Sequence, residues 1–338
     1  MEQAMAKLKQ IAERTGMAVS TVSAVLSGKE YCYVSKEKKE LVRKVAAEMG
    51  YVPNRMSRGL QGLSTDTVGV VGSLFETPVF SIMLARLNEN LWDAGYSIMH
   101  GDSKFDPCIE RRLINEFISR GIDGLIICSS QEKGEVEKSL GGRIPCVHVN
   151  RLNDGVCVSV DREKGEFMAV EHLISKHRKK KIGFLTASVD GNNEKYLGYV
   201  EAMKKHRIDC RHEWIIETKE SGPAIAMKTG AEKIISLGLD AVVATNDIMA
   251  GNMIKYLQQA DLRVPEDIAV VGFDGVDYIC SLISPELTTV RHPTELVADK
   301  ATELLISMMK GKKISKKKNI IEPELIIGRT CGCHARSE

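Results

Sequence analysis

Polar side chains follow three short apolar runs of the sequence, and they are the residues best suited to contact a small ligand. Such apolar runs indicate buried strands, and ligands of open α/β sheets bind outside the carboxyl ends of the strands. Carboxylate and amide groups exchange hydrogen bonds with ligand hydroxyls, and a guanidinium adds a cation. Each residue could also cap a helix, and we expect capping to be part of the role at positions 246 and 247. The residues are Asn150, Arg151, Asn246, Asp247 and Asp274.

The end of the chain holds a second group of chemically active side chains, Cys331, Cys333 and His334. They could form half of a metal site or a redox pair. A complete zinc site needs a fourth ligand and usually wider ligand spacing, so we expect an unstructured thiol-bearing tail and no metal. The chain has nine cysteines and no secretory signal, which favours reduced cytosolic thiols over a disulfide framework.

Motifs of catalysis and of cofactor binding are missing from the sequence. No glycine-rich phosphate loop follows a strand, and no Ser/His/Asp or Cys/His set stands in a motif context. We therefore expect neither an enzyme nor a cofactor.

The elements that must position these residues alternate along most of the chain. Apolar runs typical of buried strands are separated by amphipathic segments that end at glycine, as at Gly95 and Gly121. Alternation of this kind predicts parallel sheets covered by helices on both faces, and its repetition predicts two doubly wound subdomains. We expect strands near 68–71, 96–99, 125–128, 145–149, 181–185, 241–244 and 268–273, and helices near 80–94, 106–120, 194–206 and 247–259.

The first 62 residues differ from this pattern and predict three short helices. A helix containing Leu8 and Ile11 is broken at 15–18, and a second helix follows at 20–26. Two short helices across a glycine-bearing turn are typical of a helix-turn-helix, whose second helix enters the DNA major groove. A third helix should begin after Ser35 and end at Gly50. We expect a core of Leu8, Val22, Leu26, Leu41 and Val45.

Charge is concentrated in the same segment. Residues 1–62 contain eleven Lys and Arg against six Glu, a balance of +5, whereas the whole chain carries +2 and the remainder therefore −3. A local positive charge suits the phosphate backbone of DNA. A solvated charged face on an ordinary helical domain is the alternative.

Length and hydropathy bound the remaining possibilities. A chain of 338 residues favours two or three domains. No signal peptide and no run of membrane-spanning length stand in the sequence, so we expect a cytoplasmic protein without a membrane partner.

Over nearly its full length the chain resembles the lactose-repressor family of bacterial transcription regulators. The resemblance implies a ligand-responsive repressor with a helix-turn-helix domain, a hinge helix and a core like a periplasmic sugar-binding protein. It also implies a homodimer on pseudo-palindromic operator DNA, with a tetramer left open. The matching stretches are Ser-Thr-Val-Ser at 20–23, Gly-Tyr-Val-Pro-Asn at 50–54, Val-Glu-His-Leu at 170–173, Asn-Asp at 246–247, Val-Pro-Glu-Asp-Ile-Ala-Val-Val-Gly-Phe-Asp at 264–274 and Leu-Thr-Thr-Val at 287–290.

Domain limits and residue roles follow from the resemblance by position. It implies a DNA-binding domain at 1–52, a hinge at 53–65 and a core at 66–338, with one subdomain at about 66–160 and 292–322 and the other at about 161–291 and 323–330. It places Val19, Ser20 and Ala24 toward bases, Thr21 and Ser23 toward the DNA backbone, and Leu60 as a wedge in the minor groove. It adds Lys9, Asn54 and Arg55 as further DNA contacts. It places Phe80, Arg151, Lys195, Asn246, Asp247 and Asp274 around the effector cleft.

Two of these positions depart from the family pattern. Ala24 and Lys195 stand where arginine is frequent, so guanine readout and a bidentate fork are lost. We therefore expect an operator that differs from the family consensus.

Two other classes of protein compete with the repressor. A solute-binding protein would share the core fold, but the basic helical module and the missing signal peptide argue against it. An enzyme on the same core lacks a catalytic constellation. As effector a sugar is favoured, because Asp274 and Asn246 can bond to hydroxyls; a nucleobase or a corepressor protein stays open, as does the direction of the response.

Overall fold

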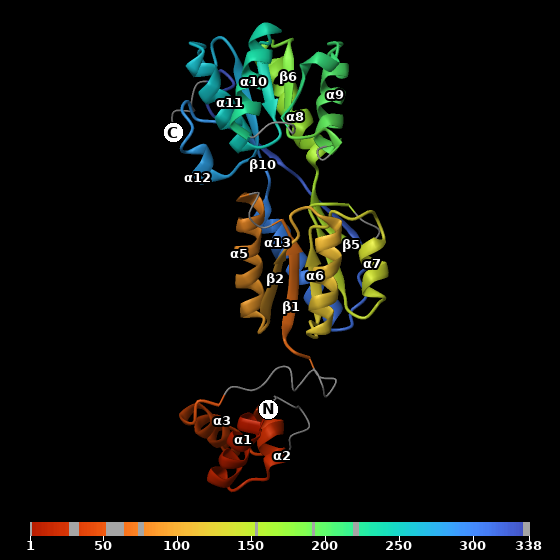
Figure 1. Cartoon of the computed structure of the whole chain (residues 1–338), viewed down its shortest axis with the longest axis vertical. Coiled ribbons are helices and arrows are strands. Elements are labelled where there is room, and N and C mark those ends of the chain that lie inside the picture. The colour runs from red at the N-terminus through yellow and green to blue at the C-terminus, as the bar shows by residue number, and fades with distance from the viewer. Residues whose placement is uncertain are drawn as a thin grey trace.

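The structure is a computed structural model that describes residues 2–26, 34–51, 64–73, 78–152, 155–190, 193–218 and 223–333. A small helical domain and two α/β lobes follow one another along the long axis of the molecule (Figure 1). The hinge helix expected at 53–65, with Asn54, Arg55 and Leu60, falls almost entirely outside the described residues.

Three helices form the N-terminal domain: α1 (Glu2–Thr15), α2 (Val19–Leu26) and α3 (Lys36–Glu48). Gly16 ends α1 with a φ of 63°, a conformation that favours glycine, and the Met17 amide then bonds to the Ala12 carbonyl at 3.0 Å. Gly50 ends α3 in the same way, and Ser35 caps its start by accepting a hydrogen bond from the Lys38 amide. These three signals were predicted from the sequence and are confirmed.

The core of this domain corrects one prediction. Leu41 was expected inside but is 43% exposed, whereas its neighbour Val42 is fully buried. Val42, Val45 and Ala46 face the core together, because positions i, i+3 and i+4 share one side of a helix. The other buried residues of this core are Ile11, Ala12, Val22 and Val25, with Leu8 and Leu26 packed beside them.

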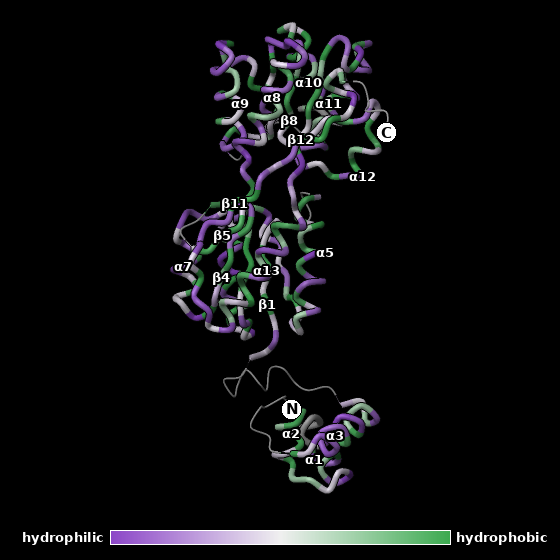
Figure 2. The backbone as a smooth tube through the Cα atoms, turned by 180° about the vertical axis from the view of Figure 1, so that it is seen from behind, coloured by the Kyte–Doolittle hydropathy of each residue, from purple (hydrophilic) through white to green (hydrophobic). Residues whose placement is uncertain are grey.

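The first lobe is a six-stranded parallel sheet in the order β11-β5-β4-β3-β1-β2. Helices α5 (Pro78–Asp93) and α13 (Thr294–Met309) pack on one face of the sheet, and α6 (Pro107–Ser119) and α7 (Glu135–Leu140) on the other. Hydrophobic residues concentrate in the strands, as expected for a sheet covered on both sides (Figure 2). The strands are β1 (Thr67–Gly72), β2 (Ser97–Asp102), β3 (Gly124–Ile127), β4 (Cys146–Val149), β5 (Val156–Val160) and β11 (Lys318–Ile321).

The second lobe repeats the plan in the order β12-β10-β9-β8-β6-β7, with only β12 antiparallel to its neighbour. Its strands are β6 (Ile182–Thr186), β7 (Ile215–Glu217), β8 (Ala241–Ala244), β9 (Ala269–Asp274), β10 (Thr288–Arg291) and β12 (Glu324–Ile326). Its helices are α8 (Arg162–His177), α9 (Asn193–Lys205), α10 (Pro223–Ser236), α11 (Asp247–Gln259), the short α12 (Asp277–Cys280) and a 3₁₀ turn, η2 (His212–Trp214).

The chain passes between the lobes three times: from β5 to α8, from β10 to α13, and from β11 to β12. Each lobe is therefore built from separate stretches of sequence. The predicted fold class, an N-terminal helix-turn-helix with two doubly wound parallel-sheet subdomains, is confirmed. Within the described ranges, no helix is both long and apolar enough to cross a membrane.

The last described residues correct a second prediction. Cys331 is 1% exposed and Cys333 is half-buried, so neither belongs to an unstructured tail. The preceding residue, Thr330, accepts two hydrogen bonds, both at 2.9 Å. Its hydroxyl accepts from the Thr288 amide, and its carbonyl accepts from the Val270 amide. These two hydrogen bonds hold the segment with the two cysteines against the second lobe. His334 lies outside the described residues.

Candidate functional site

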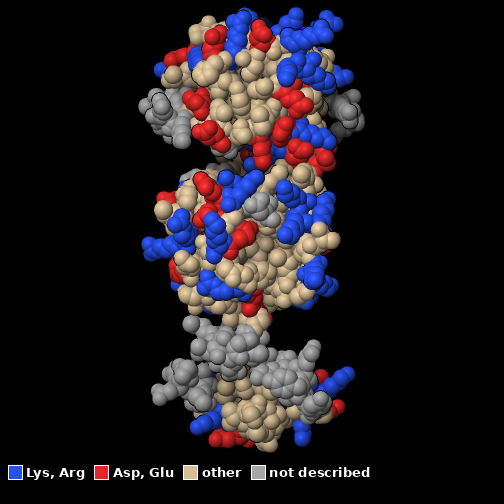
Figure 3. All heavy atoms as spheres, turned by 90° about the vertical axis from the view of Figure 1, so that its right-hand side faces the viewer, with Lys and Arg blue, Asp and Glu red and all other residues tan. Residues whose placement is uncertain are grey.

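Polar side chains from both lobes gather where the chain passes between them. Two of them follow β4 of the first lobe, two lie in the first turns of α8, one lies in α9, and two follow or end β10 and β9. Basic and acidic side chains meet at the waist between the lobes (Figure 3). We refer to these residues as the interlobe cluster: Asn150, Arg151, Arg162, Glu166, Lys195, Asp274 and His292.

His292 joins the strand ends of the two lobes. Its Nε2 atom lies 3.0 Å from Oδ1 of Asn150, and its backbone amide donates to the Asp274 carbonyl at 2.8 Å. Burial, with a smaller effect of the cations Arg162 and Lys195, lowers the pKa of His292 to about 3. The imidazole is therefore neutral, and Nε2 bonds to the amide oxygen as a donor. The Arg162 guanidinium donates to the Asn150 carbonyl and lies 3.7 Å from the Glu194 carboxylate.

Lys195 and Asp274 form the charged centre of the cluster. The Lys195 ammonium is almost fully buried, donates to the Thr245 carbonyl at 2.5 Å and lies 3.6 Å from the centroid of the Phe273 ring. Burial lowers the pKa of Lys195, while Asp274 opposes that shift. Burial likewise raises the pKa of Asp274 to about 7, against the effect of Lys195.

Asp274 is the member of this pair that is free to bind a ligand. Its side chain is half-buried, and its carboxylate makes no hydrogen bond to any described residue. A carboxyl group with a pKa near neutrality can accept or donate a hydrogen bond. A ligand hydroxyl can therefore form a hydrogen bond with the Asp274 carboxyl group whether that group is protonated or ionised.

Glu166 was missed by the sequence analysis. It is 1% exposed, and its Oε1 atom has no hydrogen-bond partner within the described part of the chain. Burial raises its pKa to about 8, while Lys195 acts in the opposite direction. The sequence pattern could have indicated that Glu166 is buried, because it lies on the apolar face of α8 with Ala169, Val170 and Leu173. A buried carboxyl there indicates a functional or strained site.

Two other predicted effector residues, Asn246 and Asp247, make hydrogen bonds within the second lobe. Asn246 caps α11 by accepting from the Met249 amide at 2.8 Å, as expected. Asp247 is 1% exposed and uses both oxygens internally, one for the Thr289 hydroxyl at 2.5 Å and one for the Val276 amide at 2.9 Å.

On the first lobe, Phe80 is 4% exposed and its ring covers Gly72 at the end of β1. Arg151 is exposed, and its guanidinium donates to the Ser129 carbonyl at 2.9 Å. The structure thus brings Lys195 and Asp274 together and places Arg151 on the opposite lobe.

The predicted DNA-contacting residues cluster around α2. Val19 and Ser20 are exposed in its first turn, and Thr21 is half-buried beside them. Ser23 is half-buried too, and Ala24 packs partly against the three-helix core. Lys9 is exposed on α1. An exposed first turn is what a recognition helix needs to reach base edges.

Comparisons with known proteins agree with both parts of this architecture. Residues 7–54 match the family model of bacterial regulatory proteins of the lacI family, and residues 170–331 match a periplasmic binding protein-like domain. The HTH-type transcriptional repressor PurR of Mannheimia succiniciproducens is 26% identical over 338 residues, covering 96% of this chain and 98% of its own length.

Solved structures show the same fold. The lac repressor dimer bound to operator and the anti-inducer ONPF has a TM-score of 0.83 at 21% identity, over 95% of this chain and 97% of that one. A sugar-binding transcriptional regulator of the lacI family from Escherichia coli, complexed with phosphate, has a TM-score of 0.70 at 26% identity, over 79% of this chain and 98% of that one.

A helix-turn-helix domain joined to a two-lobed periplasmic-binding-like core defines a DNA-binding transcriptional regulator with a ligand-binding core. The predicted resemblance to the lacI family of bacterial regulatory proteins is therefore confirmed over both parts of the chain. The curated relatives are named as HTH-type transcriptional repressors or regulators, not as enzymes.

Proposed function

We propose that this repressor binds a small polyhydroxylated ligand, a sugar, at the interlobe cluster, and that the ligand sets its affinity for operator DNA. The observation that carries the proposal is the half-buried carboxylate of Asp274, which faces the Lys195 ammonium and has no hydrogen-bond partner among the described residues. A buried polar group left unpaired costs free energy, and a ligand that pairs with it recovers that cost.

The chemistry of the cluster favours hydroxyls. Asp274 and the neutral carboxyl of Glu166 offer acceptors and donors, and Arg151 offers a guanidinium from the first lobe. Mixed donors and acceptors suit a sugar better than a highly charged ligand. The E. coli relative described as sugar-binding supports this class. A nucleobase is the second candidate, because it also presents hydrogen-bond donors and acceptors to a carboxyl group and a guanidinium.

The three segments that connect the two lobes explain how a ligand bound between the lobes could change DNA binding. A ligand that touches both lobes favours one closure angle, and so shifts a pre-existing equilibrium between arrangements. The hydrogen bond between His292 and Asn150 lies at this junction and should be part of the moving contact.

We infer a homodimer, in which that angle sets the spacing of two DNA-binding domains on two half-sites. Support comes from exposed apolar side chains on both lobes: Trp92 is 70% exposed, Tyr278 57% and Leu282 84%. These residues lie on or next to α5 and α12, which lie on the same side of the molecule (Figures 1 and 2). Exposed large apolar side chains on one side of both lobes support a protein interface there.

For DNA binding we propose the residue roles that the resemblance to the lactose-repressor family implies. Val19 and Ser20 face bases with Ala24, and Thr21 and Ser23 face the backbone. Lys9, Asn54 and Arg55 add contacts outside α2, and Leu60 wedges into the minor groove. We assign the DNA-binding domain to 1–52, the hinge to 53–65 and the core to 66–338, in a protein that works in the cytoplasm, where operator DNA lies.

A ligand screen tests the proposal. The full chain is heated with a panel of sugars and nucleosides, and each compound that raises the unfolding temperature is titrated by calorimetry. Asp274→Asn should weaken binding by about 10- to 100-fold, the loss expected for hydrogen bonds to a charged group. Asn tolerates the positive φ of 113° at this position, so the backbone is preserved.

Asp209→Asn is the matched control, because Asp209 is an exposed residue of the same lobe. Equal affinity of the two variants for the ligand would show that the cluster is not the binding site. Stabilisation by nucleosides alone would replace the sugar with a nucleobase.

A further inference from the structure

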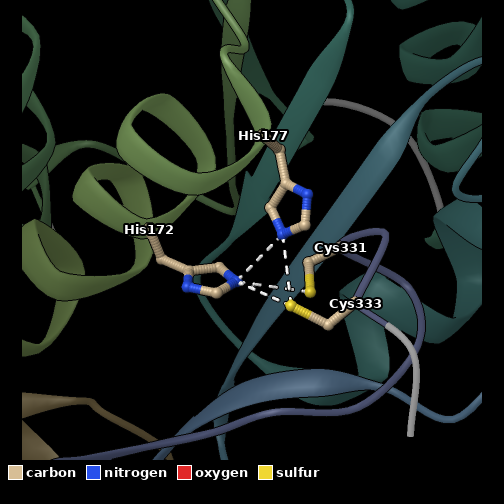
Figure 4. Close-up of side chains that lie close together, drawn as sticks. All are labelled: His172, His177, Cys331 and Cys333. Carbon is tan, nitrogen blue, oxygen red and sulfur yellow. Dashed lines mark hydrogen bonds between the residues drawn. The ribbon is translucent and has the colours of Figure 1, made fainter.

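Four side chains capable of binding a metal converge where the end of α8 meets the segment after β12 in the second lobe. His172 and His177 come from the last turns of α8, and Cys331 and Cys333 come from the segment after β12. One ligand atom from each lies within 4.8 Å of every other. The two Nε2 atoms and the two Sγ atoms point toward one common centre (Figure 4).

The separations match the edges of a coordination tetrahedron. With zinc–nitrogen bonds of about 2.0–2.1 Å and zinc–sulfur bonds of about 2.3 Å, those edges are about 3.3 Å between nitrogens and about 3.6 Å between nitrogen and sulfur. The two Nε2 atoms are 3.2 Å apart. The Nε2 atom of His172 lies 3.4 Å from Sγ of Cys331 and 3.7 Å from Sγ of Cys333, which is 3.3 Å from Nε2 of His177.

We propose that His172, His177, Cys331 and Cys333 bind one structural zinc ion. Two imidazoles and two thiolates are a ligand set that zinc prefers, and four protein ligands close the site to substrate. Two thiolates balance the double charge of zinc, so the loaded site is neutral and suits its partly buried position.

The backbone around Gly332 places the two cysteines next to the two histidines. Gly332 stands between them with a φ of 102°, and its amide donates to the Arg329 carbonyl at 3.1 Å. A Cβ at this position would lie 3.2 Å from Nδ1 of His177, so a glycine lets the turn approach the imidazole closely. The hydrogen bonds of the Thr330 hydroxyl with the Thr288 amide and of the Thr330 carbonyl with the Val270 amide fix the start of the turn on the sheet.

The histidines are ready to bind the ion. Burial lowers the pKa of His172 to about 4, with His177 and Lys176 as further causes, so its ring is neutral at neutral pH. Burial also raises the pKa of Cys333 to about 11, so without metal this thiol holds its proton. Zinc binding therefore releases the thiol protons to solvent while the two zinc–sulfur bonds form.

The site would bind the chain end to α8, the helix that carries Arg162 and Glu166 at its other end. The ion thereby stabilises the lobe that supplies Lys195 and Asp274. This assignment does not depend on the identity of the effector.

The test is the metal content of the full chain, purified under reducing conditions without a polyhistidine tag and without chelators. We expect about one zinc ion per chain by elemental analysis. Replacement by cobalt(II) should give the intense visible bands of a tetrahedral site, with a thiolate-to-cobalt charge-transfer band in the near ultraviolet. A reduced, folded chain that binds cobalt without that band, or binds no metal at all, would overturn the proposal, as would a disulfide between Cys331 and Cys333 in the freshly reduced protein.

Variants locate the ion. Cys333→Ser and His177→Gln should each weaken zinc binding by at least roughly 100-fold, because losing even a residue that only hydrogen-bonds to a metal ligand can cost that much. Cys108→Ser and His212→Gln, exposed residues of the same types, should keep the full zinc content. Folding of each variant is checked by the fluorescence of the buried Trp214. If the ligand variants are folded and keep their zinc, the site is elsewhere.

Discussion

Helices α8 and α9 approach each other closely at Gly198. A Cβ added at Gly198 would overlap the carbonyl oxygen of Glu163, and would lie 2.9 Å from its carbonyl carbon and 3.0 Å from the Phe167 amide nitrogen. All three atoms belong to the backbone of α8, so no rotamer change relieves the overlap. Gly198→Ala must push two packed helices apart.

The cost follows from overpacking. Extra methyl groups in packed interiors cost about 1–3 kcal/mol, and a backbone clash belongs at the upper end of that range, so we expect a loss of about 2–3 kcal/mol. Gly230→Ala in α10 is the matched control. Its Cβ would meet only side-chain ends, Ile216 Cγ2 at 3.2 Å and Met253 Cε at 3.4 Å. There the better helix propensity of Ala should stabilise the lobe by up to about 1 kcal/mol.

The assay uses one of the two tryptophans of the chain. Trp214 lies buried in the second lobe, whereas Trp92 is 70% exposed in the first, so Trp92→Phe leaves a probe of the second lobe alone. Urea unfolding in that background gives the two free-energy changes. Shifts of opposite sign are expected, with Gly198→Ala also weakening ligand binding because α9 carries Lys195. An unchanged Gly198→Ala variant would refute the close approach of the helices.

Other predictions concern pH, packing and DNA. The pKa of Glu166 is raised in the folded chain, so its contribution to the unfolding free energy is full below about pH 4.5 and is lost as the pH rises through about 8. Glu166→Gln should flatten the dependence of the unfolding free energy on pH over that window. An equally steep dependence in the variant would contradict the raised pKa. In the DNA-binding domain, Val42→Ala should cost about 1–3 kcal/mol and Leu41→Ala within about 0.5 kcal/mol by thermal unfolding, and a reversed order would refute the core described. Lys9→Ala should weaken binding to operator and random duplex alike and reduce the slope of log K against log salt by about 0.9, whereas a loss confined to the operator would make Lys9 a base reader. Leu60→Ala should weaken operator binding while sparing the random duplex, and equal losses on both would exclude the wedge.

Local signals in the sequence predicted the helix ends well. Gly16, Gly50, Ser35 and Asn246 work through backbone groups a few residues away, so their chemistry is readable from neighbours alone. The apolar spacing was less decisive at Leu41. Positions 41 and 42 both lie within one turn of Val45, so spacing alone did not distinguish Leu41 from Val42 as the inward residue.

Contacts between residues that are far apart in the sequence could not be predicted from local sequence patterns. The Cys-Gly-Cys turn gave only half of a ligand set, because the two histidines that complete it lie more than 150 residues earlier in the chain. Glu166 was overlooked for a similar reason: its partner Lys195 sits on another helix, and the burial of both depends on how α8 packs against α9.

The central claim is that a ligand in the interlobe cluster controls operator binding. The most direct measurement is the operator affinity of the parent, Asp274→Asn and Asp209→Asn, each without ligand and with a saturating concentration of the compound found in the screen. We expect equal affinities without ligand, and a ligand response in the parent and Asp209→Asn that is lost in Asp274→Asn at the same concentration. A full response in Asp274→Asn would contradict the account, because control of DNA binding would then come from another site.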